Sequence, residues 1–518
     1  NLEGVRAASL AYFGKEPRRL TLDEIALLVA IPQSPEARRP DRFAANAARA
    51  RNRVLERMTA AGLVPADEAE HARKAIAPGL RRPMPALAPH SADQAVAAAP
   101  GRSVHRLTID ASLQKRLEEL ASDRARALGS DVSVAILAVR HSIGEVLARV
   151  ANADYFDESR AGQVDMSAAV RSPGSALKPF IYGLAFEDGV VHPETLIDDR
   201  PVRFGAYAPE NFDLTFQGTV TVRKALQLSL NVPAVMLLDA VRASRLTARL
   251  AAAGAPLVLP KGETPGLAMG LGGVGVRLAD LVMLYAALAR GGEATALIER
   301  NDGADALNVG RRLLDPVAAW YVGQILLGAP PPEHAAVGRI AFKTGTSYGY
   351  RDAWAVGFDG QQTIGVWVGR PDGAPVPGLV GRSAAAPILF EAFARSGTAI
   401  APLPRAPKGA VILSTARLPA ALQRFHANGP RDGGGDVKIL FPPDGARLEL
   451  AQRSGGRSDP VPLKTAGGVA PFTVLVNGVP VKRDGSRAIL WMPDGPGFAR
   501  LTVMDARGSA DSVLVRVQ

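Results

Sequence analysis

The 518-residue chain contains no cysteine at all, and only seven of its residues are histidine. The absence of cysteine excludes disulfide bonds, iron–sulfur clusters and cysteine-based zinc sites. The histidines are scattered along the chain without the spacing of metal ligands. We therefore expect no metal site and no other cofactor in this protein.

Long apolar runs are also missing, since no stretch reaches the roughly eighteen apolar residues that a membrane-spanning helix needs. The chain begins Asn1-Leu2-Glu3, with neither a methionine nor a signal peptide, so we expect a fragment whose natural N-terminus lies upstream. The net charge of +11 suits nucleic acid, an anionic membrane or an acidic polymer. No basic run interleaved with aromatic residues and no nucleic-acid fingerprint accompanies it, so nucleic acid is not an expected partner.

The length predicts two to four domains, and 47% hydrophobic residues with 21% charged residues are typical of a folded protein. Changes in composition and in apolar periodicity along the chain divide it into five parts. We expect a helical part over 1–76, a proline- and alanine-rich linker over 77–103, an α+β domain over 104–396, a loose linker over 397–435, and an all-β sandwich over 436–518.

Local signals place elements inside these parts. A capping box of Thr21 and Glu24 opens a helix in the first part, and the apolar residues at helical spacing behind it are Leu22, Ile25, Leu28 and Val29. In the α+β domain, five apolar segments predict an antiparallel sheet: Val132–Val139, Glu145–Val150, Ile340–Phe342 leading into residues 343–346, Asp352–Phe358 and Thr363–Val368. The glycine-dense segment 268–276 lacks the context of a phosphate-binding loop, so we reject that reading.

Two Ser-x-x-Lys patterns in the chain could each supply a serine nucleophile with a lysine as its proton acceptor. One is Ser175 with Lys178, where a loop turns into a helix. Three residues along a helix bring both side chains to one face, and Pro179 is tolerated in the first turn. The other is Ser112 with Lys115, which we interpret as the solvated face of an ordinary helix capped by Asp110.

Two further motifs decide between these serines. Ser229-Leu230-Asn231 is the only Ser-x-Asn in the chain. Pro233 disfavours helical geometry in the residue that precedes it, so we predict a loop or break in the helix at that point. Lys343-Thr344-Gly345 is the only Lys-Thr-Gly, and it lies on a predicted strand, where Gly345 would let a ligand backbone approach closely. The order Ser-x-x-Lys, Ser-x-Asn, Lys-Thr-Gly is that of the serine β-lactamases and penicillin-binding proteins.

The local sequences sharpen this resemblance. Ser-Pro-Gly-Ser-Ala-Leu-Lys-Pro-Phe at 172–180 and Lys-Thr-Gly-Thr-Ser-Tyr-Gly-Tyr-Arg-Asp-Ala-Trp at 343–354 resemble the transpeptidase domains of class A penicillin-binding proteins, the 1C type above all. Residues 1–5 and 12–15 look like the end of the glycosyltransferase domain of these proteins, and the final sandwich resembles their immunoglobulin-like C-terminal module.

The resemblance implies a role for each motif residue. Ser175 would be the nucleophile, Lys178 its general base, Ser229 a proton relay, and Asn231 a holder of Lys178 and of the substrate amide. Lys343 would attract the terminal carboxylate of the substrate. A neutral lysine is required at 178, and both burial and the neighbouring Lys343 would lower its pKa.

Substrate binding would fall to the strand that carries the third motif. There the hydroxyls of Thr344 and Thr346 would assist Lys343, with Gly345 between them. The main-chain N–H groups of Ser175 and Thr346 would form the oxyanion hole.

The implied function is D,D-transpeptidation of peptidoglycan stem peptides through a serine acyl-enzyme, with β-lactams as inhibitors. A D,D-carboxypeptidase or β-lactamase-like hydrolase stays open, as does a non-catalytic cell-wall binding or scaffolding protein. The family's glycosyltransferase glutamates lie upstream, and Glu3, Glu16 and Glu24 do not stand in its motif, so we expect no glycosyltransferase activity in this chain. Implied partners are stem peptides, glycan strands, the membrane through an upstream anchor, and cell-wall proteins at the sandwich. The implied location is the periplasmic face of the bacterial inner membrane.

Overall fold

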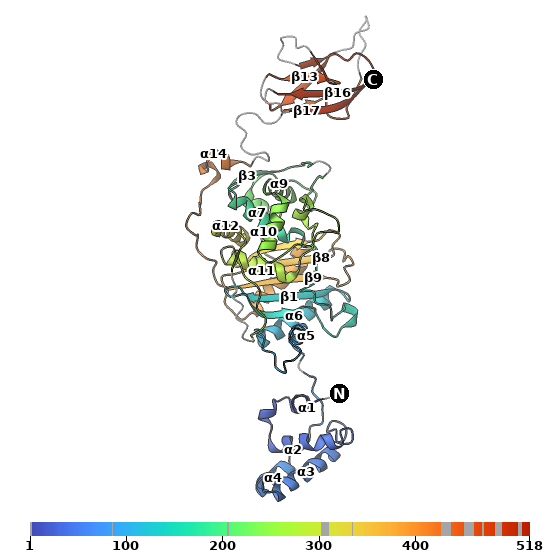
Figure 1. The fold of residues 1–518 in the computed structure, drawn as a ribbon, viewed down its shortest axis with the longest axis vertical. Coiled ribbons are helices and arrows are strands. Elements are labelled where there is room, and N and C mark those ends of the chain that lie inside the picture. Colours follow the sequence, from blue (N-terminus) through green and yellow to red (C-terminus); the bar gives the residue numbers. More distant parts are fainter. Residues whose placement is uncertain are drawn as a thin grey trace.

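The computed structural model describes residues 3–84, 86–204, 207–301, 310–333, 335–425, 437–449, 460–468, 471–481, 489–505 and 510–518. Figure 1 shows a helical N-terminal part, a large central domain and a C-terminal β-sandwich. Each part has buried apolar clusters of its own. No helix within the described ranges is long and apolar enough to cross a membrane.

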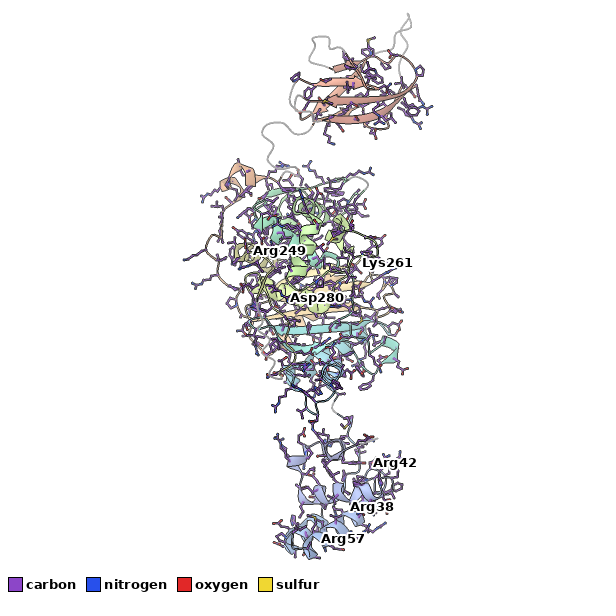
Figure 2. All side chains as sticks on the ribbon, viewed as in Figure 1. Arg38, Arg42, Arg57, Arg249, Lys261 and Asp280 are labelled. Atoms are coloured by element: carbon purple, nitrogen blue, oxygen red, sulfur yellow. The ribbon has the colours of Figure 1, made fainter. Side chains whose placement is uncertain are left out.

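The N-terminal part consists of α1 (Val5–Phe13), α2 (Leu22–Ala30), α3 (Ala44–Ala60) and α4 (Ala66–Arg73). The capping box of Thr21 and Glu24 is present at the start of α2, as predicted. Of the apolar residues at helical spacing that indicated this helix, Leu28 is buried, whereas Ile25 and Val29 are 40% and 57% exposed. Small residues such as Ala26 face the core instead, and their size lets α2 approach α3 closely. Arginines, among them Arg38, Arg42 and Arg57, give this part a basic character (Figure 2).

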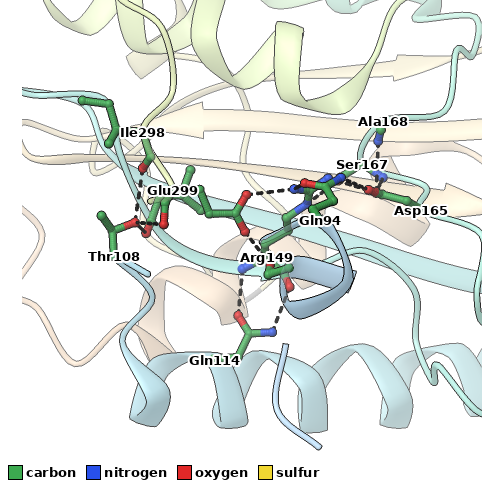
Figure 3. A network of polar contacts seen from close by, with 11 residues as sticks. Gln94, Thr108, Gln114, Arg149, Asp165, Ser167, Ala168, Ile298 and Glu299 are labelled. Carbon is green, nitrogen blue, oxygen red and sulfur yellow. Dashed lines mark hydrogen bonds and ion pairs between the residues drawn. The ribbon is translucent and has the colours of Figure 1, made fainter. Parts of the chain in front are cut away.

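The stretch 77–103, expected as a linker, contains helix α5 (Pro89–Ala98). A polar network around Arg149 fastens this helix to the central domain (Figure 3). The Arg149 guanidinium donates to Gln94 on α5, to Glu299 at 2.8 Å and to Ser167 at 2.9 Å, and it pairs with Asp165. Residues 89–98 therefore belong structurally to the domain that follows them.

A five-stranded antiparallel sheet of order β2-β1-β9-β8-β7 forms the centre of the central domain. Its strands are β1 (Ser133–Arg140), β2 (Glu145–Val150), β7 (Ala341–Thr346), β8 (Asp352–Phe358) and β9 (Gln362–Gly369). The predicted antiparallel sheet is confirmed. Motif-bearing β7 lies at one edge of this sheet, where it pairs with β8 alone.

Helices cover both faces of this sheet. Successive residues of β1 alternate between two apolar clusters, as the two-residue period of a strand requires. One face packs against α6 (Ala111–Leu128) and α13 (Ala386–Arg395). The other packs against α11 (Leu278–Ala289) and α12 (Pro316–Leu327), and one apolar cluster continues from there into α7 (Lys178–Glu187), α8 (Val222–Gln227), α9 (Asn231–Val241) and α10 (Ala243–Ala252).

Short elements complete the domain. Strands β3 (Leu196–Asp199) and β4 (Gly218–Thr221) pair as a hairpin within the stretch that precedes α8, and β5 (Glu293–Ala294) pairs with β6 (Arg311–Arg312). Arg249 of α10 forms an ion pair with Glu187 at the end of α7, with Nη2 and Oε1 2.7 Å apart (Figure 2). This pair anchors the end of α7 that lies away from the serine motif.

The C-terminal module is all β, as predicted, with two facing sheets around one apolar cluster. Its strands are β10 (Lys438–Phe441), β11 (Arg447–Leu448), β12 (Val461–Ala466), β13 (Thr473–Val476), β14 (Val479–Pro480), β15 (Ile489–Trp491), β16 (Gly497–Met504) and β17 (Ala510–Val517). Strand β12 was missed from the sequence, because Pro462 and Lys464 interrupt its apolar pattern on the exposed face.

Candidate active site

The predicted serine turn lies where the chain enters α7. Ser175 is half-buried within the short 3-10 turn η4 (Gly174–Leu177), and α7 begins at Lys178. Pro179 is the second residue of that helix, where its missing N–H has no helical partner to lose. Gly174 adopts φ +52°, a left-handed conformation that glycine tolerates best. The backbone thus turns sharply and presents Ser175 at the edge of a cleft.

Lys178 is fully buried, which is exceptional for a lysine. Its Nζ donates to the carbonyl oxygens of Ser229 at 2.6 Å and Leu230 at 3.0 Å, and to Oδ1 of Asn231 at 2.6 Å. Burial lowers its pKa well below the usual value, Lys343 lowers it further, and Asp199 opposes both. Within the described chain no hydrogen bond joins Lys178 to Ser175, although such contacts often tighten only when substrate binds.

The second motif occupies a break between two helices. Helix α8 ends at Gln227, and α9 begins at Asn231. The break precedes Asn231 rather than Pro233 as we predicted: Pro233 lies in the first turn of α9, where the lack of an N–H costs nothing. Ser229 takes φ +60° within the break. Its carbonyl thereby reaches Lys178 while its hydroxyl reaches Lys343.

The third motif places a second buried lysine opposite the first. Lys343 on β7 is 4% exposed, and its Nζ donates to Ser229 Oγ and to the carbonyl of Thr344, both at 2.8 Å. Burial lowers the pKa of Lys343 to about 7. Thr344 and Thr346 are half-buried beside it, and Thr346 Oγ1 accepts a hydrogen bond from the N–H of Gly381 at 3.0 Å. All eight predicted residues therefore lie on three neighbouring segments.

Glycines allow these segments to pack backbone against backbone. A Cβ at Gly345 would lie 2.3 Å from the carbonyl oxygen of Pro173, and one at Gly272 would lie 2.6 Å from the Cα of Gly174. The close approach predicted at Gly345 therefore involves the protein's own serine turn rather than a ligand. The glycine-dense segment 268–276 supports that turn from a second side through Gly272.

Two aromatic side chains fix the serine turn further, although sequence patterns gave them no role. The hydroxyl of buried Tyr285 on α11 donates to the carbonyl of Ala176 at 2.8 Å. The indole Nε1 of buried Trp354 on β8 donates to the carbonyl of Ser172 at 2.8 Å. Both carbonyls flank Ser175, so the turn is held to both the helical layer and the sheet.

The motif residues open onto one cleft of about 560 Å³, which Ser175, Ser229, Asn231 and residues 343–346 line. Its rim carries large apolar side chains that are open to solvent: Phe212, Leu214, Tyr348 and Tyr350. Among the described residues, no group of three or more histidine, aspartate or glutamate side chains could hold a metal ion. The side chains of Ser175, Lys178 and Lys343 are of the kinds that can serve as nucleophile, proton acceptor and cation.

The rival serine does not share these features. Lys115 on α6 is 69% exposed in its side chain, as predicted, whereas Leu113 and Leu117 face the core. Ser112 lies in the first turn after the N-cap Asp110, and its hydroxyl accepts a hydrogen bond from Arg116. This serine and this lysine are parts of a solvated helix face.

Known families match three parts of the chain. The penicillin-binding protein transpeptidase domain matches residues 134–371, the transglycosylase family matches residues 1–59, and the penicillin-binding protein C-terminus family matches residues 426–517. The chain belongs to the class A penicillin-binding proteins, as the resemblance of its motifs implied.

Within this class, the chain resembles the 1C type. The chain is 43% identical over 395 residues to penicillin-binding protein 1C of Escherichia coli, covering 75% of this chain and 50% of that protein. It is 27% identical over 403 residues to penicillin-binding protein 1F of Bacillus subtilis, covering 71% and 55%. The chain thus spans about half the length of the curated relatives it matches.

Solved structures share the fold. Penicillin-binding protein 1A from Haemophilus influenzae superposes with a TM-score of 0.55 at 16% identity, covering 88% of each chain. The PonA1 protein from Mycobacterium tuberculosis, solved in complex with penicillin V, gives a TM-score of 0.51 at 21% identity, covering 59% of this chain and 89% of that one.

Proposed function

We propose that this chain is a serine D,D-transpeptidase that cross-links peptidoglycan stem peptides, and that β-lactams acylate the same serine. The observation that carries the proposal is the pairing of two buried lysines around a nucleophile. Lys178 follows Ser175 by one turn with a strongly lowered pKa, and Lys343 faces the same cleft from β7. A base and a cation are thereby available at one serine.

In the first step, Ser175 Oγ attacks the carbonyl carbon between the two terminal D-alanines of a stem peptide. Neutral Lys178 takes the hydroxyl proton. Its ammonium form then has three oxygen acceptors within 3.0 Å, which stabilise the charge that the proton brings. Burial favours the neutral base before the reaction, and these oxygens favour the ammonium afterwards.

Ser229 completes the proton transfer. Its hydroxyl lies 2.8 Å from Lys343 Nζ and can pass a proton to the amine of the departing D-alanine, while the proton that Lys178 took from Ser175 replaces the one Ser229 gives up. The C–N bond breaks, and the donor peptide remains on Ser175 as an ester. The amine of a second stem peptide then attacks this ester, forms the cross-link and returns the proton to Ser175.

Lys343 in its charged form attracts the terminal carboxylate of the donor peptide, with the hydroxyls of Thr344 and Thr346 beside it. The N–H groups of Ser175 and Thr346 would stabilise the oxyanion of each tetrahedral intermediate, a contribution that commonly amounts to about 3–4 kcal/mol per donor. Asn231 would contact the substrate amide as well as Lys178.

Labelling with a fluorescent penicillin tests the acyl-enzyme. The unmodified chain should be labelled, Ser175→Ala should not, and Ser112→Ala should be labelled fully. An unmodified chain that takes no label would refute the acyl-enzyme. Loss of label in Ser112→Ala would show that Ser112, and not Ser175, is the nucleophile.

A second assay separates transfer from hydrolysis. The chain is incubated with labelled stem pentapeptide and an amine acceptor, and cross-linked dimer is measured against released tetrapeptide. Dimer as the main product supports the transpeptidase; tetrapeptide alone would make the protein a carboxypeptidase. A folded chain that forms neither product and takes no penicillin would instead be a binding or scaffolding protein.

The setting of this reaction follows from the family. We propose that the chain acts at the periplasmic face of a bacterial inner membrane on stem peptides attached to glycan strands. The domain bounds proposed are those expected from the sequence, with the linker of 77–103 shortened by the docked helix α5. The C-terminal sandwich is proposed as a module that contacts cell-wall proteins. These assignments rest on the three family matches and on the likeness to the 1C type.

A further inference from the structure

Beneath the candidate active site lies a carboxylate that the proposed reaction does not use. Asp199, at the end of β3, is fully buried. Its oxygens accept hydrogen bonds from Asn211 Nδ2 at 2.9 Å each and from the main-chain N–H of Gln217 at 2.7 Å. Within the described residues no lysine, arginine or histidine forms an ion pair with it. A buried charge bound only by neutral donors is costly, so its presence beneath the site calls for an explanation.

The partner of this carboxylate is an asparagine whose amide is fully bonded. Asn211 is 3% exposed, and besides Asp199 its Nδ2 donates to the carbonyl of Thr215 at 2.8 Å. Its Oδ1 accepts the main-chain N–H of Asn231 at 2.7 Å. That N–H belongs to the first residue of α9 and has no acceptor within the helix. Asn211 therefore caps the helix that presents the second motif.

The same segment also fixes the side chain of Asn231. Its Nδ2 donates to the carbonyl of Glu210 at 2.6 Å, so its Oδ1 must point the other way, toward Lys178 Nζ. A carboxylate can only accept hydrogen bonds, so Asp199 dictates which end of the Asn211 amide faces it. Asp199 thus fixes the orientation of the Asn211 amide, and the segment that carries Asn211 fixes the orientation of the Asn231 amide.

We propose that Asp199 and Asn211 are positioning residues for the acylation reaction: the Asp199 carboxylate orients Asn211, and Asn211 with its neighbouring carbonyl orients Asn231 so that its oxygen faces Lys178. The inference rests on the proposed function, because it assigns these residues to the site of that reaction. Neither residue touches the substrate or the reacting serine in this scheme.

The pair also contributes charge. The charged groups that act on Lys178 are Lys343 of β7, which favours the neutral amine, and Asp199 of β3, which favours the ammonium. Tyr182, one turn further along α7, is buried near Asp199 with a raised pKa and stays neutral. Removing the Asp199 charge should therefore lower the pKa of Lys178. The acid side of the pH profile of acylation should move to lower pH as a result.

Three variants of the full-length chain test whether Asp199 and Asn211 orient Asn231. The readout is the second-order rate of acylation by a fluorescent penicillin. Asp199→Asn sets two amide nitrogens face to face, and Asn211→Asp sets two carboxylates face to face. Each should slow acylation about tenfold to a hundredfold, the size expected when a reacting group is displaced by a fraction of an ångström to about one ångström. The exchanged pair, Asp199→Asn with Asn211→Asp, again matches a donor with an acceptor and should recover about tenfold over Asn211→Asp alone.

A matched control separates positioning from loss of stability. Asn152 is 5% exposed and donates to three carbonyl oxygens, but it lies outside the cleft. Asn152→Asp should lower the melting temperature while the folded fraction is acylated within about twofold of the unmodified rate. Rates are expressed per labelled site, so partial unfolding does not enter them.

The outcomes separate the two proposals. A slowed Asp199→Asn with its acid limb moved to lower pH, and recovery in the exchanged pair, supports the inference. The inference is overturned if the single variants react within about threefold of the unmodified chain. It is also overturned if the exchanged pair is no faster than Asn211→Asp and the pH profile does not change. Absence of label on the unmodified chain overturns the proposed function itself.

Discussion

The close packing at Gly174 leads to a sharp prediction about how precisely the serine turn must be placed. A methyl group in Gly174→Ala would lie 2.2 Å from the carbonyl oxygen of Thr346, whereas real Cβ contacts essentially never fall below 3.0 Å. The serine turn and β7 would therefore have to separate by about 0.8 Å, the difference between these two distances. This separation moves Ser175 away from Lys343 and Thr346.

The expected result is a loss of acylation that exceeds the loss of stability. A displacement of about 1 Å at a reacting centre can cost about a hundredfold in rate. A left-handed alanine by itself costs only about 1–2 kcal/mol of folding stability. We therefore expect Gly174→Ala to remain folded and to react with fluorescent penicillin about a hundredfold more slowly than the unmodified chain.

Gly189 offers the matched control. It has φ +65°, close to the +52° of Gly174, but a Cβ there would meet nothing within 4 Å. Gly189→Ala carries the backbone strain without the clash, so its melting temperature should fall while its acylation rate stays unchanged. The steric reasoning would be refuted if Gly174→Ala reacted as fast as Gly189→Ala in stopped-flow labelling.

Two further predictions concern the buried lysines. The second-order rate of acylation should depend on pH as a bell-shaped curve. The rate should fall in acid as Lys178 takes up a proton, and it should fall above about pH 7 as Lys343 loses its proton. A flat profile between pH 5 and 9 would contradict these roles. Lys343→Met should abolish acylation yet raise the free energy of unfolding near pH 7 by about 1–4 kcal/mol, because a buried ammonium is removed. Because the pKa of Lys343 is about 7 when folded and about 10.5 when unfolded, the unfolded chain holds more protons between these values. The stability of the unmodified chain should therefore rise toward that of Lys343→Met across this range in urea titrations, whereas exposed Lys115→Met should show no such pH-dependent difference.

The residues of the three motifs could be predicted from the sequence to lie together, because each motif is local and chemically specific. Ser175, Ser229, Asn231 and Lys343 line one cleft, Lys178 is bonded to Ser229 and Asn231 behind it, and the strands of the central sheet form where the apolar segments lie. Their proposed roles in catalysis await the experiments above.

What could not be predicted depends on contacts between distant segments. Asp199 and Asn211 lie in a stretch that reads as irregular, and only the folded chain shows that both are buried under Asn231. Pro233 seemed to end a helix, but the residues before it place it in a first turn instead. On α2 the apolar residues Ile25 and Val29 are exposed, whereas Ala26, Leu27, Leu28 and Ala30 are buried. Local patterns do not record which neighbour a helix packs against.

The left-handed backbone of Ser229 has a consequence for how many protons the site holds. This single residue stands between two buried amines, with its carbonyl bound to Lys178 and its hydroxyl to Lys343. Two positive charges across one residue repel each other, so a proton on either lysine disfavours a proton on the other. The two lysines together therefore disfavour holding two protons at once. In the proposed reaction a single proton on Lys343 balances the one carboxylate of the acyl donor, and a donor whose terminus is an uncharged amide would leave that charge without a counterpart.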